Sequence, residues 1–138
     1  IKIYIAAKNQ LRGFINGEFL PMFREKLTVL FEIVSDWYLE SPGYLKPEQR
    51  AKTDLKQIGQ CDVMIVLGDI EFGENEWGNN SLGNSKSVGR FFEMGYAHCL
   101  VKRILYFGPP MSIFHTLCTQ CNTIDELIVR LEEINRGK

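Results

Sequence analysis

The sequence lacks any run of eighteen or more apolar residues, so it predicts no membrane span. It also lacks a basic stripe, because 16 Lys and Arg residues stand against 17 Asp and Glu residues, a formal net charge of −1. Binding to a nucleic-acid polymer is therefore not expected. The first residues have the pattern of a strand and not that of a signal peptide.

Several catalytic motifs are absent as well. There is no G-x-S-x-G elbow, no Walker A loop and no G-x-G-x-x-G fingerprint. Hydrolysis by a serine nucleophile, classical phosphoryl transfer and hydride transfer are therefore not expected.

Cysteine is scarce, with four residues in the chain. Cys61 and Cys99 lie in apolar sequence, where a free thiol behaves as a small hydrophobe. Cys118 and Cys121 have C-x-x-C spacing, but a second ligand pair for zinc and the context of a redox motif are both missing. We expect no metal and no cofactor. A cytoplasmic protein with reduced thiols is the simpler interpretation.

What is present is an alternation of strand and helix patterns along a single domain, residues 1–138. Strands are expected at 1–6, 33–38, 61–67 and 103–107, and helices at 18–30, 47–60, 88–101 and 123–134. The region 29–38 is ambiguous between helix and strand, and its β-branched and aromatic residues favour a strand. This order predicts an α/β fold, a three-layer sandwich with a mainly parallel, flavodoxin- or Rossmann-like sheet.

Ligands of such sheets bind outside the carboxyl ends of the strands. This rule brings residues 4–13, 68–93 and 108–116 to one edge. The glycine- and asparagine-rich loop 68–86 is long for a small domain, which favours a functional lid.

Glu93 is the most unusual residue near this edge. It interrupts the helix expected at 88–101, whose side chains are apolar nearly all round, as in a buried helix. Its place in the first two turns predicts a carboxylate kept ionised by the helix N-terminus. The alternative is a structural Glu that caps a loop amide or pairs with Arg90.

Three aspartates and a tyrosine complete the candidates. Asp69 ends a strand at the ligand edge and has the best position for substrate contact, whereas Asp62 starts that strand and is expected to be structural. Asp54 lies on the preceding helix. Tyr4 could donate a hydrogen bond to a carboxylate, or it is a core tyrosine.

A set of short motifs in order along residues 1–110 resembles the nucleoside 2-deoxyribosyltransferase family, including the related deoxynucleoside 5′-monophosphate N-glycosidases. The motifs are Ile3-Tyr4-Ile5-Ala6, Thr53-Asp54-Leu55-Lys56-Gln57-Ile58 with Cys61-Asp62, Ser87-Val88-Gly89, Phe92-Glu93-Met94-Gly95-Tyr96-Ala97 and Lys102-Arg103-Ile104-Leu105.

This resemblance implies that Glu93 is a nucleophile that attacks C1′ of a ribosyl or deoxyribosyl group and forms a covalent glycosyl-enzyme. It implies that Tyr4 orients this nucleophile. It assigns Asp54 to base recognition, and Asp69 stays a second candidate. Gly89 belongs to a matched motif and is expected to line the substrate site.

The sequence departs from the transferases at Ser87, where they carry an aspartate that handles the base. The N-glycosidases carry a serine there for phosphate, and a residue near a helix N-terminus suits that role. Their first loop has a serine where this chain has Lys8-Asn9-Gln10, so Lys8 or Arg12 is the candidate for a phosphate contact. Trp77 is the candidate for stacking on a base.

Three hypotheses stay open at this point. The chain is a nucleoside transferase, a nucleoside 5′-monophosphate N-glycosidase, or a nucleotide-binding protein without turnover. The resemblance also implies a homodimer or larger homo-oligomer whose neighbouring subunit completes the site. Ser112 and Thr116 are the expected contacts across that interface.

Overall fold

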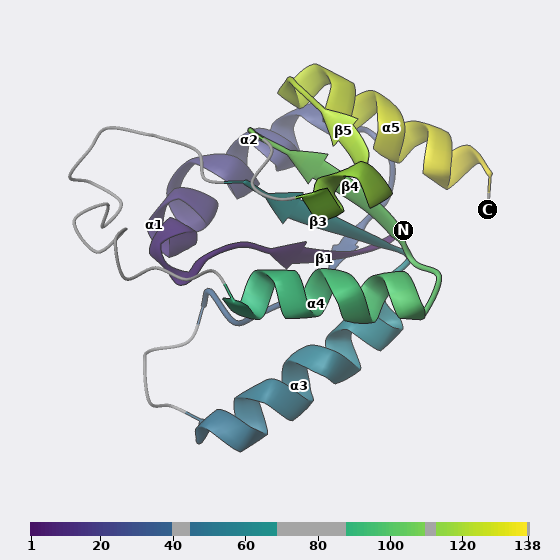
Figure 1. Ribbon diagram of the computed structural model, residues 1–138. Helices are drawn as coiled ribbons and strands as arrows, with labels where there is room; N and C mark the ends of the chain where they lie inside the picture. Colours follow the sequence, from purple (N-terminus) through teal and green to yellow (C-terminus); the bar gives the residue numbers. More distant parts are fainter. Residues whose placement is uncertain (40–44, 69–87, 110–112, 138) are drawn as a thin grey trace.

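The computed structural model describes residues 1–39, 45–68, 88–109 and 113–137, and its centre is a five-stranded parallel sheet (Figure 1). The strand order is β2-β1-β3-β4-β5. The strands are β1 (Lys2–Ala6), β2 (Glu32–Ile33), β3 (Val63–Leu67), β4 (Arg103–Phe107) and β5 (Thr119–Cys121). This is the strand order of flavodoxin-like folds, so the predicted sheet type is confirmed.

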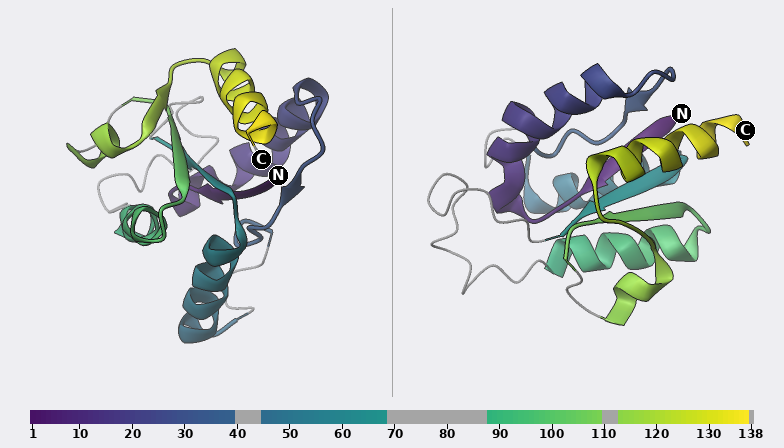
Figure 2. Two further views of the ribbon diagram at one scale, coloured as in Figure 1. Left: turned by 90° about the vertical axis from the view of Figure 1, so that its right-hand side faces the viewer. Right: turned by 90° about the horizontal axis from the view of Figure 1, so that it is seen from above.

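Helices cover both faces of the sheet (Figure 2). On one side lie α3 (Pro47–Gln60) and α4 (Val88–Cys99). The other side carries α1 (Arg12–Phe14), α2 (Leu20–Lys26) and α5 (Ile124–Arg136). Short helical turns are η1 (Asn9–Leu11), the π-helical η2 (Ile15–Phe19) and η4 (Ile113–Leu117). The predicted three-layer arrangement is confirmed.

The best-predicted elements have clear end signals. The observed α3 begins at Pro47, where the missing N–H costs nothing, and ends at Gln60. β4 spans the predicted 103–107. In α5 the hydroxyl of the N-cap residue Thr123 accepts a hydrogen bond from the Glu126 N–H. All five residues of β3 are buried, as expected for the centre of a parallel sheet.

The first helical region begins earlier than predicted. Helical turns run from Arg12 to Lys26 in place of 18–30, through α1, η2 and α2. Gly13 and Gly17 oppose a helix there by propensity. Burial of the apolar stripe Phe14, Ile15, Phe19, Leu20 and Phe23 overrides them.

The second strand is shorter than the predicted 33–38, because side chains take over its pairing with β1. The Ile5 N–H donates to the Ser35 hydroxyl at 3.0 Å, and the Trp37 indole donates to the Ile5 carbonyl at 2.8 Å. Both backbone groups of Ile5 are thereby satisfied without a further rung of the ladder. The short strand β5 was not predicted, since it has three residues and lies at an edge.

None of the described helices has the length and apolarity needed to cross a membrane.

Candidate active site

The sheet has a topological switch point between the neighbouring strands β1 and β3. At such a point the strand order reverses its direction. From β1 the chain crosses to β2 on one side, and from β3 it crosses to β4 on the other. Such a switch point opens a crevice at the carboxyl ends of the strands. Tyr4 lies on β1 at this point, in register with Met64 of β3.

Tyr4 and Glu93 form a direct pair. The hydroxyl of Tyr4 donates a hydrogen bond to Oε2 of Glu93, across 89 residues of sequence. Tyr4 is fully buried in the sheet. Burial and the nearby Glu93 carboxylate raise the pKa of Tyr4 well above its ordinary value, so the phenol keeps its proton and acts as a donor. The hydrogen bond fixes the orientation of one oxygen of the Glu93 carboxyl group.

The Glu93 carboxyl group does not stay fully ionised, which corrects the expectation from the sequence. Burial raises the pKa of Glu93 to about 7, the Tyr4 hydrogen bond lowers it, and the nearby Asp54 carboxylate raises it. Glu93 is the sixth residue of α4, beyond the first turn in which the helix N-terminus acts. The effect of desolvation on the Glu93 pKa therefore outweighs that of the helix dipole, and the carboxyl group titrates near neutral pH.

Asp54 belongs to the same cluster through α3, and it is bound by an arginine that the sequence interpretation missed. Arg50 Nε lies 2.9 Å and Nη2 2.7 Å from Asp54 Oδ1. Nη2 also lies 2.7 Å from Asp36 Oδ1, to which Gln57 Nε2 donates at 2.9 Å. The spacing of Arg50, Asp54 and Gln57, four and then three residues, places them on one helix face, and this signal could have identified them.

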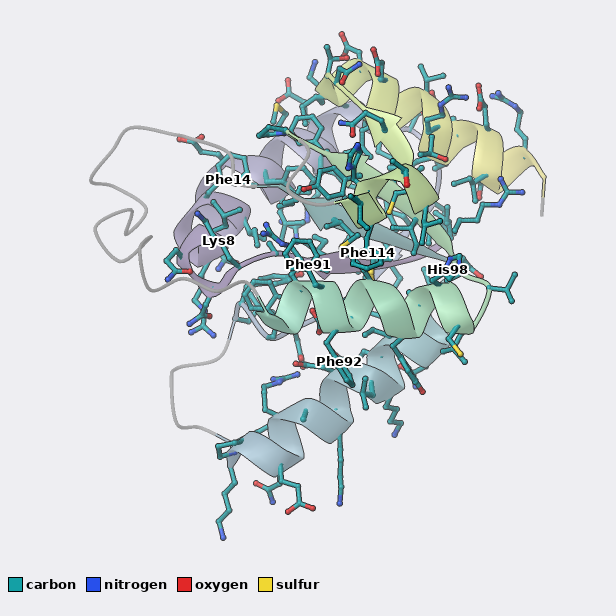
Figure 3. All side chains as sticks on the ribbon, viewed as in Figure 1. Lys8, Phe14, Phe91, Phe92, His98 and Phe114 are labelled. Atoms are coloured by element: carbon teal, nitrogen blue, oxygen red, sulfur yellow. The ribbon has the colours of Figure 1, made fainter. Side chains whose placement is uncertain are left out.

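The helix that carries Glu93 is only partly buried, which is a second correction. Met94 and Ala97 face the core, but Phe92 is 64% exposed. Phe91 and Phe92 leave α4 on opposite sides (Figure 3). Gly89 and Gly95 are exposed, and a Cβ at either would meet no atom of the described chain within 4 Å. No other described element therefore packs closely against either glycine.

The remaining substrate-binding candidates are not all placed. Asp69, Trp77 and Ser87 lie outside the described residues, as do Ser112 and the loop 69–87. Thr116 is exposed on η4, and its hydroxyl donates to the Ile113 carbonyl at 2.7 Å. It is therefore turned into its own helical turn in this single chain.

The two cations proposed for phosphate differ in their surroundings. Lys8 lies two residues beyond the end of β1, next to α1 (Figure 3), and is 7% exposed. Arg12 Nη2 donates to the Trp37 carbonyl at 2.7 Å, which ties the first helix to the segment after β2. Lys8 therefore lies close in sequence to the carboxyl end of β1, where ligands of such sheets bind.

The strand ends of β3 and β4 are tightly packed beside this crevice. The Gly68 N–H donates to the Phe107 carbonyl at 2.7 Å. A Cβ at Gly68 would lie 3.0 Å from the Pro109 carbonyl oxygen and 3.2 Å from the Tyr106 hydroxyl. A side chain at this position would require the neighbouring oxygen atoms to move by a few tenths of an ångström.

The cysteines form no site of their own in the described chain. Cys61 and Cys121 are buried, whereas Cys99 is exposed, contrary to its apolar sequence context. Burial raises the pKa of the Cys118 thiol to about 11 and also raises that of Cys121. Such thiols are protonated and unreactive at neutral pH. Within the described ranges no group of three His, Cys, Asp or Glu side chains could hold a metal ion.

Comparison with solved structures finds two proteins that are similar in fold over nearly the whole chain. A CMP N-glycosidase of Clostridium botulinum has 18% identity and a TM-score of 0.56, covering 96% of this chain and 98% of the other. A 2-deoxyribosyltransferase of Bacillus psychrosaccharolyticus has 16% identity and a TM-score of 0.58, covering 93% and 90%.

At these identities the likeness establishes a common fold, and it confirms the structural resemblance expected from the sequence motifs. No protein-family model matches the sequence, and a search of curated proteins finds no significant match.

Proposed function

We propose that this protein is an enzyme that cleaves or exchanges the N-glycosidic bond of nucleosides, with Glu93 as nucleophile. The observation that carries the proposal is the Tyr4–Glu93 pair at the switch point of the sheet. The common fold with a 2-deoxyribosyltransferase and a CMP N-glycosidase supports it. A nucleophilic carboxylate needs to be ionised, oriented and close to the substrate; Tyr4 orients Glu93, and with a pKa of about 7 the carboxyl group is partly ionised near neutral pH.

In the proposed reaction a Glu93 oxygen forms a bond to C1′ of the sugar. The C1′–N bond breaks, and its electron pair leaves with the base, which takes up a proton. The carboxylate stabilises the positive charge that develops on the sugar. A second base or water then attacks C1′ and loses a proton to solvent, while the bond between C1′ and the Glu93 oxygen breaks and the carboxylate is released. The Tyr4 hydroxyl, held in the core, orients the carboxyl group during both steps.

The 5′-monophosphate N-glycosidase hypothesis is the second candidate, and Lys8 favours it. Lys8 is largely buried and follows the carboxyl end of β1 by two residues, and a lysine ammonium group is a suitable partner for a phosphate. The serine at position 87, in place of the transferase aspartate, points the same way. Lys8→Met should then weaken use of a 5′-monophosphate far more than use of the matching nucleoside.

The deciding assay measures release of free base from nucleosides and from their 5′-monophosphates, with and without an acceptor base. Transfer requires the acceptor, whereas hydrolysis proceeds in water. Glu93→Gln should abolish both, and Glu25→Gln, an exposed glutamate on α2, is the matched control. A 2-fluoro-substituted nucleoside should add its glycosyl mass to the peptide that contains Glu93. Nucleoside binding without base release or adduct would instead support the binding-protein hypothesis.

We also propose a homo-oligomer that forms through α4 and η4. Six large apolar side chains are exposed on α4, the turn after it and η4. They are Phe92, Leu100, Val101, Ile113, Phe114 and Leu117. Exposed apolar area of this kind marks interaction surfaces. Phe92→Asp should lower the molar mass measured by light scattering, with Val129→Asp on α5 as control. An unchanged mass would contradict this interface.

A further inference from the structure

Arg50 holds two carboxylates from different parts of the fold. Its guanidinium lies 2.7 Å from Asp36 Oδ1 and 2.7 Å from Asp54 Oδ1. The side chains of Arg50 and Asp54 are 20% and 19% exposed, so the pair is largely shielded from water. A shielded guanidinium with two carboxylate partners has a fixed orientation, unlike a surface ion pair.

The Asp36 end of this bridge is an anchor. Asp36 follows β2, and its Oδ1 accepts from both Arg50 and Gln57. These bonds lower the pKa of the Asp36 carboxyl group, so it stays ionised. Two residues of α3 are thereby tied to the segment after β2. The rotamer of Arg50 is set by this anchor and not by Asp54 alone.

The Asp54 end reaches the candidate active site. Asp54 and Glu93 are both carboxyl groups on helices that pack against each other, α3 and α4. Two neighbouring carboxylates oppose each other's ionisation. The charge of Arg50 offsets that of Asp54, and the two act on Glu93 in opposite directions.

We propose that Arg50 is a positioning residue for the nucleophile: anchored by Asp36, it holds Asp54 in one orientation and neutralises it, so that Glu93 can ionise beside Asp54. This role rests on the proposed function of Glu93. It also restricts the orientation of Asp54, because Oδ1 of Asp54 accepts from Arg50.

The following groups, on the elements packed against α4 and on α4 itself, are not assigned the role proposed for Arg50. The elements packed against α4 are α3, β1, β3 and β4. From β1 the Tyr4 hydroxyl donates to Glu93, and β3 carries no ionisable side chain. On β4, Arg103 is exposed, and the Tyr106 hydroxyl donates to the Pro109 carbonyl. Arg90, on α4 itself, donates to the Leu67 carbonyl.

The test measures the ionisation midpoint of Glu93 directly, by NMR of ¹³C-labelled glutamate carboxyl groups, with Glu93→Gln to assign the signal. Arg50→Gln should raise the midpoint by about 0.5 pH unit or more, as loss of a neighbouring opposite charge does. Asp54→Asn should lower it. When Asp54→Asn is already present, Arg50→Gln should raise the Glu93 midpoint by less, because the negative charge of Asp54 that Arg50 offsets is no longer there.

Two further variants serve as controls for the midpoint measurement. Lys52→Gln removes an exposed cation of the same helix, paired with Glu48, and should leave the midpoint unchanged. Arg50→Lys keeps the charge without the two-carboxylate geometry, so it should preserve the midpoint but lower the rate of base release. If Arg50→Gln does not fold, the Asp54→Asn and Arg50→Lys results still decide.

A Glu93 midpoint that is equal in wild type, Arg50→Gln and Lys52→Gln would overturn the inference. The NMR measurement needs no turnover, so its result is independent of the proposed function. If the wild-type enzyme releases base but the Glu93 midpoint does not move in Arg50→Gln, the role of Arg50 is refuted and the proposed function is not. A protein that releases no base while the midpoint moves refutes the proposed function alone.

Discussion

Replacing Glu93 by Gln should make the protein more stable, and more so at higher pH. The carboxyl group is held in a partly buried position beside Tyr4, where its pKa rises from 4.5 to about 7. Between these two pH values the folded state binds a proton that the unfolded state has lost. The free energy of unfolding therefore falls as the pH rises through this window. A glutamine in the same place accepts the Tyr4 hydrogen bond and carries no charge.

The size of the effect follows from the two pKa values. A difference of about 2.5 pH units corresponds to about 3.4 kcal/mol once the group is ionised in both states. At pH 8 nearly all of this penalty is present, and at pH 5 less than about 1 kcal/mol of it is. The stability gain of Glu93→Gln should therefore be larger at pH 8 than at pH 5 by about 2.5 kcal/mol.

Urea denaturation of wild type and Glu93→Gln at several pH values between 5 and 8 measures this difference. Glu25→Gln is the control, because an exposed glutamate should add no such pH dependence. A gain from Glu93→Gln that is the same at pH 5 and pH 8 would refute the reasoning that burial raises the pKa of this carboxyl group.

Three other predictions concern the same region. Base release should increase as the pH rises through about 7, because the carboxylate form of Glu93 is the nucleophile, and a pH–rate profile checks this. Tyr4→Phe removes the bond that lowers the Glu93 pKa, so the rise should move to higher pH and the rate should fall by about tenfold or more. Gly68→Ala should destabilise the fold by about 1–3 kcal/mol in a thermal melt, since its Cβ would press on the Pro109 carbonyl; an unchanged melt would contradict this packing.

The sheet could be predicted from the sequence where hydrophobic runs and end signals agree. The run 63–67 and the Pro47 helix start are examples. The predicted ends of helices and strands were wrong where tertiary contacts determine them. Ser35 and Trp37 shorten β2 through side-chain bonds to Ile5, and no local pattern encodes such bonds.

The site was predictable only in part. Tyr4 and Glu93 are 89 residues apart, and their pairing followed from family resemblance and not from local pattern. Burial of α4 was overestimated, because an apolar sequence does not distinguish a core face from an exposed one such as that of Phe92. The Arg50–Asp36 contact depends on where the chain after β2 lies, which no helix spacing gives.

The central position of Tyr4 limits how this protein can change. The residue is fully buried in the middle of β1, in register with Met64 of the neighbouring strand β3. A substitution that re-aimed its hydroxyl would disturb the core as well as Glu93. New substrate preferences should therefore arise in the segments that leave the strand ends, where insertions and substitutions cost little stability. Directed evolution that randomises those segments and keeps the Tyr4–Glu93 pair should yield altered specificity far more often than mutation of the pair itself.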